Sequence, residues 1–134
     1  MDDPWEIQQA VLRVARCADR SDINALVENF SEDAVFEAGG RTVKGRDAIF
    51  EFLGGGRAAP STDERTKHVV TNTLLEADGD AVVATSYWQV LRSWGLANWG
   101  RYVDRFGRDD DRWKIVHRAA LSDGNIPRPQ SPSG

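Results

Sequence analysis

The chain has 134 residues, of which 40% are hydrophobic and 28% are charged, and its formal net charge is −4 at pH 7. This length and composition indicate one soluble globular domain with a single core. Because the net charge is negative, we expect no basic surface that would bind nucleic acid. No stretch approaches the ~20 apolar residues of a membrane span.

The N-terminal residues and the few cysteines and histidines further limit the class of protein that this chain can be. Residues 1–4 are acidic where a secretory signal would be basic and then apolar, so we expect a cytoplasmic protein without a membrane partner. Cys17 is the single cysteine, and His68 and His117 are the only histidines. Because these three residues offer neither a disulfide nor zinc-ligand spacing, we expect no metal site.

The N-terminal part of the chain predicts helices with two short strands between them. Asp2 or Asp3 caps a first helix that has Pro4 in its first turn. Asp19 ends this helix, at the end where the helix dipole disfavours a carboxylate. The apolar stripe of the helix, with spacings of three and four, consists of Ile7, Val11, Val14, Ala15 and Ala18. The elements predicted next are a second helix from 23 to 30, strands over 34–37 and 41–43, a third helix over 45–53 and a loop over 57–64.

A long hairpin dominates the second half of the chain. Its arms, 67–76 and 81–91, are rich in β-branched and aromatic residues, and 78–80 supplies the turn. Because side chains alternate along a strand, one face of the first arm carries His68, Val70, Asn72 and Leu74. We expect this face to line a pocket. Strands over 98–107 and 112–121 follow, so residues 1–123 form one domain and 124–134 a flexible tail. This order predicts an α+β domain whose helices cover one face of a curved antiparallel sheet.

Several segments resemble the nuclear-transport-factor-2-like superfamily, and within it the SnoaL-like (polyketide cyclase and dehydratase) group. The segments that carry the resemblance are 18–22 (ADRSD), 30–36 (FSEDAVF), 44–49 (KGRDAI), 68–72 (HVVTN), 78–81 (DGDA), 100–104 (GRYVD) and 112–115 (RWKI), with Arg118. The resemblance implies a cone-shaped curved antiparallel sheet wrapped around the N-terminal helix, with three helices. One such fold carries many activities, so the reaction must come from the site.

Asp19 and His68 match two positions at which enzymes of this group hold a catalytic pair. Relatives that eliminate or hydrate small cyclic substrates place an aspartate at the end of the first helix and a histidine at the start of the third strand. The resemblance therefore implies cofactor-free proton transfer on a small hydrophobic cyclic substrate, by a lyase, isomerase or cyclase. A carboxylate partner fixes the imidazole tautomer and raises its basicity.

Two departures from the group bear on the reaction. Val14 stands where several dehydratases have a tyrosine that assists the leaving oxygen, which disfavours dehydration relative to isomerisation or cyclisation. Ala38 stands where ketosteroid isomerase has an aspartate, which disfavours isomerisation by that route. The candidate substrate-binding residues are Val14, Phe36, Asn72, Tyr102 and Arg118.

Other interpretations remain open at this point. Tyr102 either donates to a ligand oxygen or is a core aromatic residue, and Arg118 either anchors substrate or pairs with Asp104. The chain could also be a ligand-binding domain, or an assembly subunit like the small subunit of aromatic-ring dioxygenases. An enzyme requires His68 beside an open cavity and within roughly 2.6–3.2 Å of Asp19. Apolar and aromatic residues on the outer sheet face predict a homodimer or homotrimer.

Overall fold

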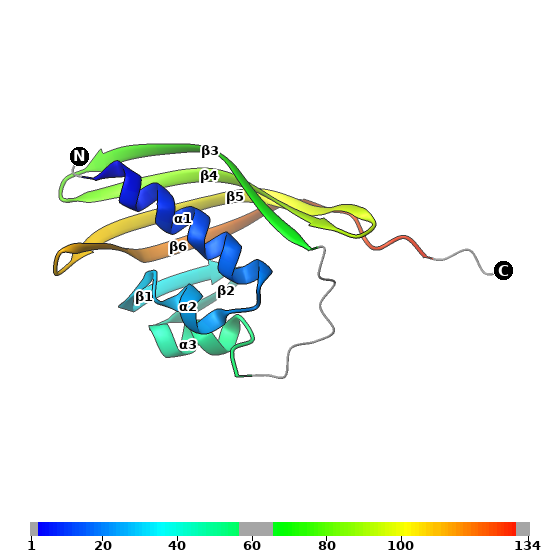
Figure 1. Ribbon diagram of the computed structural model, residues 1–134, viewed down its shortest axis with the longest axis horizontal. Coiled ribbons are helices and arrows are strands. Elements are labelled where there is room, and N and C mark those ends of the chain that lie inside the picture. Colours follow the sequence, from blue (N-terminus) through cyan, green and yellow to red (C-terminus); the bar gives the residue numbers. More distant parts are fainter. Residues whose placement is uncertain (1–2, 57–65, 131–134) are drawn as a thin grey trace.

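The computed structural model describes residues 3–56 and 66–130. Three helices and six strands follow one another along the described chain (Figure 1). They are α1 (Pro4–Asp19), α2 (Ile23–Val27), β1 (Phe30–Ala38), β2 (Arg41–Lys44), α3 (Arg46–Phe52), β3 (Lys67–Asp78), β4 (Ala81–Arg92), β5 (Gly95–Asp109) and β6 (Arg112–Asn125). The predicted loop over 57–64 lies outside the described residues, as do positions 1, 2 and 131–134. In the described parts, no helix is long and apolar enough to cross a membrane.

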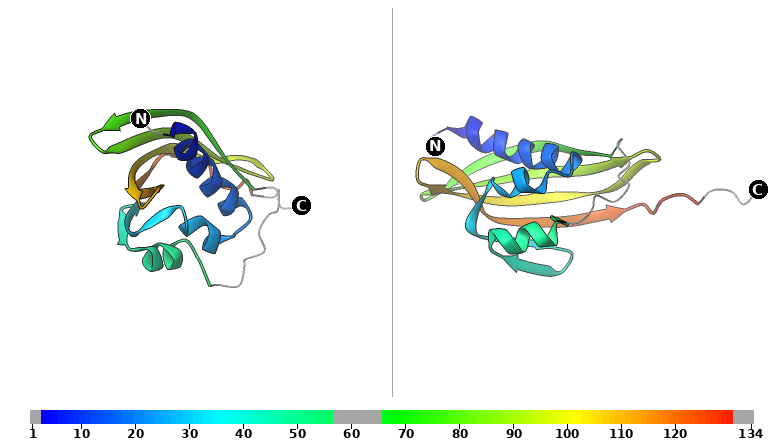
Figure 2. Two further views of the ribbon diagram at one scale, coloured as in Figure 1. Left: turned by 60° about the vertical axis from the view of Figure 1, so that its left-hand side comes forward. Right: turned by 60° about the horizontal axis from the view of Figure 1, so that its bottom comes forward.

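The strands form one curved sheet in the order β2-β1-β6-β5-β4-β3. The sheet bends around α1, which crosses its concave face, and the predicted α+β fold with three helices is confirmed (Figures 1 and 2). One pair departs from the predicted antiparallel pattern, because β1 and β6 run parallel. The chain leaves β2, crosses to the far edge as β3, and returns by three antiparallel turns, which brings β6 beside β1 in the same direction.

Helix α1 begins where the sequence predicts. The Asp3 side chain accepts a hydrogen bond from the Glu6 backbone N–H at 3.1 Å, and Pro4 occupies the first helical position. The buried face of α1 includes Ile7, Val11 and Val14, and these residues pack into the core. Each of these side chains, fully buried, stabilises the fold by ~1.5–3 kcal/mol.

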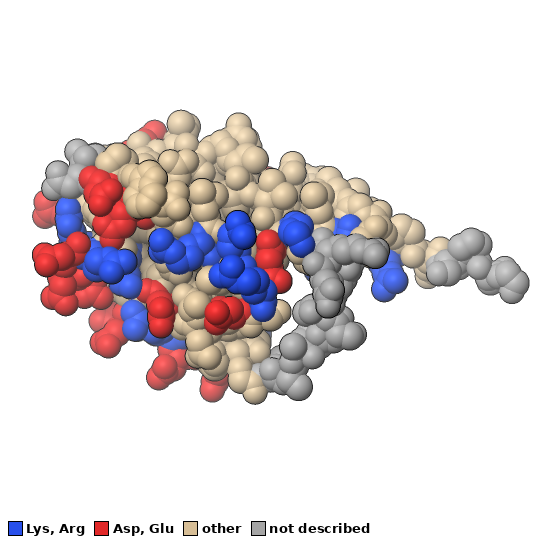
Figure 3. Space-filling model, viewed as in Figure 1, with Lys and Arg blue, Asp and Glu red and all other residues tan. Residues whose placement is uncertain are grey.

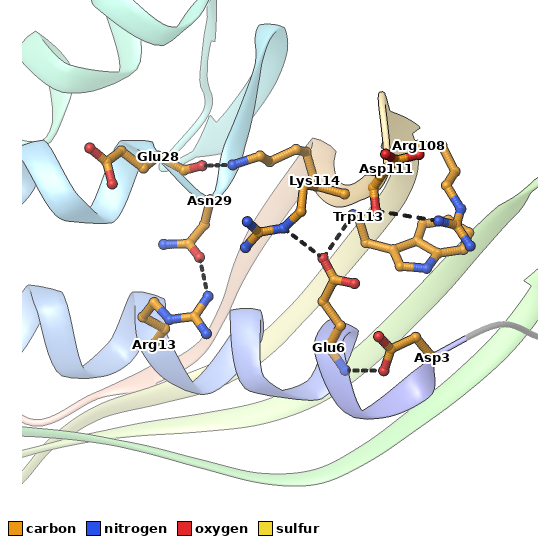
Figure 4. A network of polar contacts seen from close by, with 10 residues as sticks. Asp3, Glu6, Arg13, Glu28, Asn29, Arg108, Asp111, Trp113 and Lys114 are labelled. Carbon is orange, nitrogen blue, oxygen red and sulfur yellow. Dashed lines mark hydrogen bonds and ion pairs between the residues drawn. The ribbon is translucent and has the colours of Figure 1, made fainter.

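Polar contacts join α1 to the start of β6 (Figure 4). Glu6 Oε1 accepts hydrogen bonds from Arg112 Nε at 3.2 Å and from the Trp113 backbone N–H at 3.1 Å. Arg13 donates to Asn29 Oδ1 at 3.0 Å further along the helix. The two bonds of Glu6 fix the helix relative to the sheet at the end remote from Asp19.

Strand β3 contains a bulge that the sequence did not predict. His68 pairs with Val90, but the register shifts between Thr71 and Leu74, where Asn72 has a φ of 56°. Beyond the bulge, Leu75 packs against the core, while Asn72 is exposed and Leu74 is 65% exposed. The prediction that Asn72 and Leu74 share the face of His68 is therefore wrong, because the extra residue reverses the alternation.

Several element boundaries also differ from the predictions. Helix α2 ends at Val27, and Phe30 already belongs to β1. The sequence predicted that the strand after the hairpin begins at Asn98, whereas β5 pairs with β4 from Gly95 onward. Strand β6 runs to Asn125, so Gly124 and Asn125, which the sequence assigned to the tail, pair with β5.

Charged side chains are unevenly distributed over the surface. Arg and Lys gather near α1, whereas the region over β3 and β4 in the same view carries few charges (Figure 3). The outward-facing residues of β4 and β6 include Tyr87, Leu91 and Leu121, which are 54%, 37% and 39% exposed. Self-association through this face stays a prediction.

Candidate active site

Asp19 and His68 meet where the end of α1 approaches the start of β3. Asp19 Oδ1 accepts one hydrogen bond from the His68 backbone N–H and lies close to His68 Nδ1; both distances are 2.7 Å. The side chains of Asp19 and His68 are 11% and 26% exposed, respectively. The contacts from β3 compensate for the unfavourable place of a carboxylate at the helix C-terminus.

This contact defines the tautomer of the imidazole. A carboxylate only accepts, so Nδ1 must carry a proton and donate it to Asp19. In neutral His68 the lone pair is therefore on Nε2. Within residues 3–56 and 66–130, Nε2 has no hydrogen-bond partner, so this nitrogen is available to accept a proton.

His68 lines two cavities. One has a volume of about 260 Å³ on the inner sheet face, and its walls come from the ends of β1 and β3 to β6. It is lined by Ala38, Gly39, His68, Trp88, Val90, Asn98, Tyr102, Ala120 and Ser122. The other has a volume of about 500 Å³ and lies between α2, α3 and β3, with Ile23, Leu26, Phe50 and Leu53 as apolar lining. Since an apolar cavity of about 150 Å³ holds benzene, the inner cavity has room for a substituted or fused ring.

Tyr102 lies on the wall of the inner cavity with His68. Its ring stacks on Trp88, with centroids 5.8 Å apart and an interplanar angle of 28°. Burial raises the pKa of Tyr102 above 10.0, and the Asp104 carboxylate adds to the increase, while the Arg118 guanidinium opposes it. The phenol therefore stays protonated at neutral pH. In the described part of the chain, its hydroxyl makes no hydrogen bond.

Arg118 is buried beneath Tyr102, in a pair with Asp104. Arg118 Nε and Nη2 donate to the two carboxylate oxygens at 2.7 and 2.9 Å, and Arg118 and Asp104 are 2% and 0% exposed. Burial lowers the pKa of Arg118, but the adjacent Asp104 carboxylate outweighs it, so the net shift is upward. The guanidinium carbon lies 3.9 Å from the centroid of the Tyr102 ring. Of the two roles considered for Arg118, the pair with Asp104 is the one present.

The other candidate residues lie elsewhere. Val14 and Phe36 are 5% and 6% exposed members of the core, and neither is among the residues that line these two cavities. Asn72 is exposed at the bulge of β3. Their predicted role in substrate binding has no support in this geometry, because Val14 and Phe36 are packed in the core and the register shift in β3 leaves Asn72 exposed.

Three polar residues of the inner cavity were not among the candidate substrate-binding residues. These are Trp88, Asn98 and Ser122. Trp88 Nε1 is a buried donor for which the described residues provide no hydrogen-bond partner. Strand alternation could have found Trp88 and Ser122, since they share the inner face with Val90 and Ala120 in their own strands. We also find, among the described residues, no group of three His, Cys, Asp or Glu side chains that could hold a metal ion.

Comparisons with known proteins assign the chain to a family. A model of the SnoaL-like domain matches residues 1–119. The chain therefore belongs to the SnoaL-like domain family. A search of curated proteins found no match.

Solved structures with the same fold include proteins of different kinds. An NTF2-like protein with a cystatin-like fold from Novosphingobium aromaticivorans is 26% identical, with a TM-score of 0.77 over 92% of this chain and 84% of that protein. A protein provisionally assigned as a scytalone dehydratase from the same organism is 20% identical, with a TM-score of 0.74 over 96% and 91%. The β subunit of a provisionally assigned aromatic-ring-hydroxylating dioxygenase, also from that organism, is 18% identical, with a TM-score of 0.70 over 90% and 89%. The last two identities establish a shared fold alone.

Proposed function

We propose that this protein is a cofactor-free enzyme that moves a proton on a small hydrophobic cyclic substrate, with His68 as the base and Asp19 as its partner. The contact between Asp19 Oδ1 and His68 Nδ1 at 2.7 Å, with Nε2 unpaired in the described chain, carries the proposal. Family membership and the similarity to a dehydratase-type structure support it. The reaction class is a lyase, isomerase or cyclase.

In the proposed step, Nε2 of neutral His68 accepts a proton from a ring carbon next to a carbonyl group. The C–H electron pair forms the enolate, and its negative charge develops on the carbonyl oxygen. Asp19 stabilises the imidazolium that results, because its carboxylate keeps the hydrogen bond to Nδ1. The proton then returns to another carbon, which is isomerisation, or a leaving group departs from the neighbouring carbon.

The open cavity favours an enzyme over an assembly subunit. About 260 Å³ of space remains on the inner sheet face beside His68, and its lining combines apolar walls with a few polar groups. Ligand and active sites commonly have this composition. A subunit that serves only to hold an assembly together has no need for a base at such a cavity.

Deuterium exchange tests the proposal without knowledge of the natural substrate. The protein is incubated in D₂O with a panel of cyclic ketones of one and two rings, and incorporation at the carbon next to the carbonyl is followed by NMR. Because proton abstraction alone gives the signal, every downstream reaction is covered. We expect His68→Ala to lower the exchange rate by ~10²–10⁴, the range for a general base.

Asp19→Asn isolates the charge of the partner. Because one carboxylate oxygen accepts both hydrogen bonds from His68, the amide oxygen of the substituted side chain can keep both bonds, and only the negative charge is lost. His117→Ala is the matched control, since His117 Nε2 lies 2.9 Å from Glu37 in a pair that is 39% and 46% exposed. Exchange that survives both His68→Ala and Asp19→Asn, or that falls as much with His117→Ala, contradicts the proposed pair.

A further inference from the structure

We infer that Tyr102 is a catalytic hydrogen-bond donor, which binds the substrate oxygen on which negative charge develops, and that the buried Arg118–Asp104 pair is its positioning group. This inference rests on the proposed function and defines its substrate class as a ring bearing a carbonyl oxygen.

Tyr102 and the base line the same cavity, although the residue in register with His68 across β4 is Asn98, four residues before Tyr102. His68 stands on β3, and Tyr102 on β5, with β4 between them. Both side chains line the cavity of about 260 Å³. A ring that spans this space meets His68 on one wall and Tyr102 on the other. The step that forms an enolate needs a base at carbon and a donor at oxygen.

The ring of Tyr102 is held on both sides. Trp88 from β4 pairs with Gly100, two residues before Tyr102, and Arg118 from β6 pairs with Asp104, two residues after it. The two partner positions therefore lie before and after Tyr102 along β5, and the Trp88 ring centroid and the Arg118 guanidinium carbon are 5.8 and 3.9 Å from the centroid of the phenol ring. A donor held in this way loses little freedom when the substrate binds.

The Arg118–Asp104 pair suits this positioning role. Two nitrogens of Arg118, Nε and Nη2, donate hydrogen bonds to the two carboxylate oxygens of Asp104. These two bonds fix the plane of the guanidinium. The face of the guanidinium is left to stack on the phenol. Its positive charge favours a polarised O–H bond in Tyr102, while burial raises the pKa of the phenol and keeps the proton in place, so Tyr102 shares its hydrogen with the developing oxyanion.

NMR of the Tyr102 phenol tests the donor role without any turnover. The chain has two tyrosines, Tyr87 and Tyr102. Labelling the ring carbon that bears the hydroxyl therefore gives two signals, and Tyr87→Phe assigns them. α-Tetralone is added to one sample, and tetralin, which has the same rings without the oxygen, to another. We expect the ketone alone to shift the Tyr102 signal, while the signal of Tyr87, 54% exposed on the outer face, stays in place.

The exchange assay then tests catalysis and positioning. Tyr102→Phe should lower exchange by ~10²–10³, the loss seen for one donor to an oxyanion. The double variant Asp104→Leu/Arg118→Met replaces the pair by apolar residues, and adding Tyr102→Phe to it should cost less than ~10-fold more. A purely structural pair would leave the effect of Tyr102→Phe unchanged. Arg118→Lys serves as the second positioning variant: it keeps the charge and loses the planar face, and should lower exchange without altering the far-UV spectrum.

Each result decides one statement. If α-tetralone and the other ketones leave the Tyr102 signal unmoved, or Tyr102→Phe exchanges at the wild-type rate, the inference is overturned while the Asp19–His68 proposal stands. If the ketones shift Tyr102 but the wild-type protein exchanges no deuterium, the recognition of oxygen stands and the proposed proton transfer fails. If Tyr102→Phe costs as much in the double variant and in Arg118→Lys as in the wild type, the positioning role of Arg118 is wrong.

Discussion

Removing the charge of Asp104 should destabilise the fold strongly. Asp104 and Arg118 are 0% and 2% exposed, and two hydrogen bonds of 2.7 and 2.9 Å join them. Asp104→Asn keeps the shape of the side chain but leaves the guanidinium buried without a counter-charge. Breaking a buried pair from one side costs ~3–5 kcal/mol. That is a large part of the ~5–15 kcal/mol by which domains of this size are stable.

A surface pair of the same residue types provides the control. Arg105 Nη1 lies 2.7 Å from Asp78 Oδ2, the same distance as Arg118 Nε from Asp104 Oδ1, but the side chains are 44% and 62% exposed. Solvent screens such a pair, so Asp78→Asn should cost less than about 1 kcal/mol. The comparison holds residue type and the shortest distance constant, and it changes burial and the second hydrogen bond, which only the Arg118–Asp104 pair has.

Urea unfolding followed by tryptophan fluorescence measures both variants. At ~4 °C per kcal/mol for a chain of this length, Asp104→Asn should also lower Tm by ~12–20 °C. Asp104→Leu/Arg118→Met should recover most of the loss, because replacing both charges leaves no unpaired ion. Equal losses for Asp104→Asn and Asp78→Asn, with unchanged m-values, would refute the assignment of burial as the cause.

Three more predictions concern the backbone and the phenol. Asn72→Val should cost ~1–3 kcal/mol in urea unfolding and Asn72→Gly almost nothing, because a β-branched residue resists the φ of 56° at the bulge; equal costs would refute this cause. Gly100→Ala should cost ~3 kcal/mol or more, since its Cβ would meet the Leu121 carbonyl oxygen, whereas Gly39→Ala meets no atom within 4 Å and should lose only the ~1 kcal/mol of its positive φ. Burial raises the folded-state pKa of Tyr102 above 10.0, so its contribution to stability is complete below pH 10 and falls as the pH rises further. The difference in unfolding free energy between wild type and Tyr102→Phe should therefore shift between pH ~8 and pH ~11, and a constant difference would contradict the raised pKa.

Local patterns predicted the elements well where one residue type decides the outcome. The cap at Asp3, the first-turn Pro4 and the turn at Gly79 follow from short-range chemistry, and the structure has them. Pairing between distant segments was not accessible in this way. The parallel contact of β1 with β6 depends on where the chain re-enters the sheet after residues that no local signal constrains.

The site shows the same division. The interaction of Arg118 with Asp104 was one of two alternatives considered, and the structure has it. Alternation failed at Asn72, because a bulge adds one residue and has no reliable sequence signature. The approach of Asp19 to His68 joins positions 49 residues apart, so only the family resemblance pointed to it.

The bulge at Asn72 also affects how the protein behaves at high concentration. The sheet ends in β2 on one side, with four residues, and in β3 on the other, with 12. A long edge strand offers its free N–H and C=O groups to a strand of another molecule, and this leads to aggregation. The left-handed residue in the middle of β3 interrupts that straight row, next to Leu74, which is 65% exposed. Deleting Asn72 would straighten the edge, and we expect aggregation in the shortened chain before any loss of its helices.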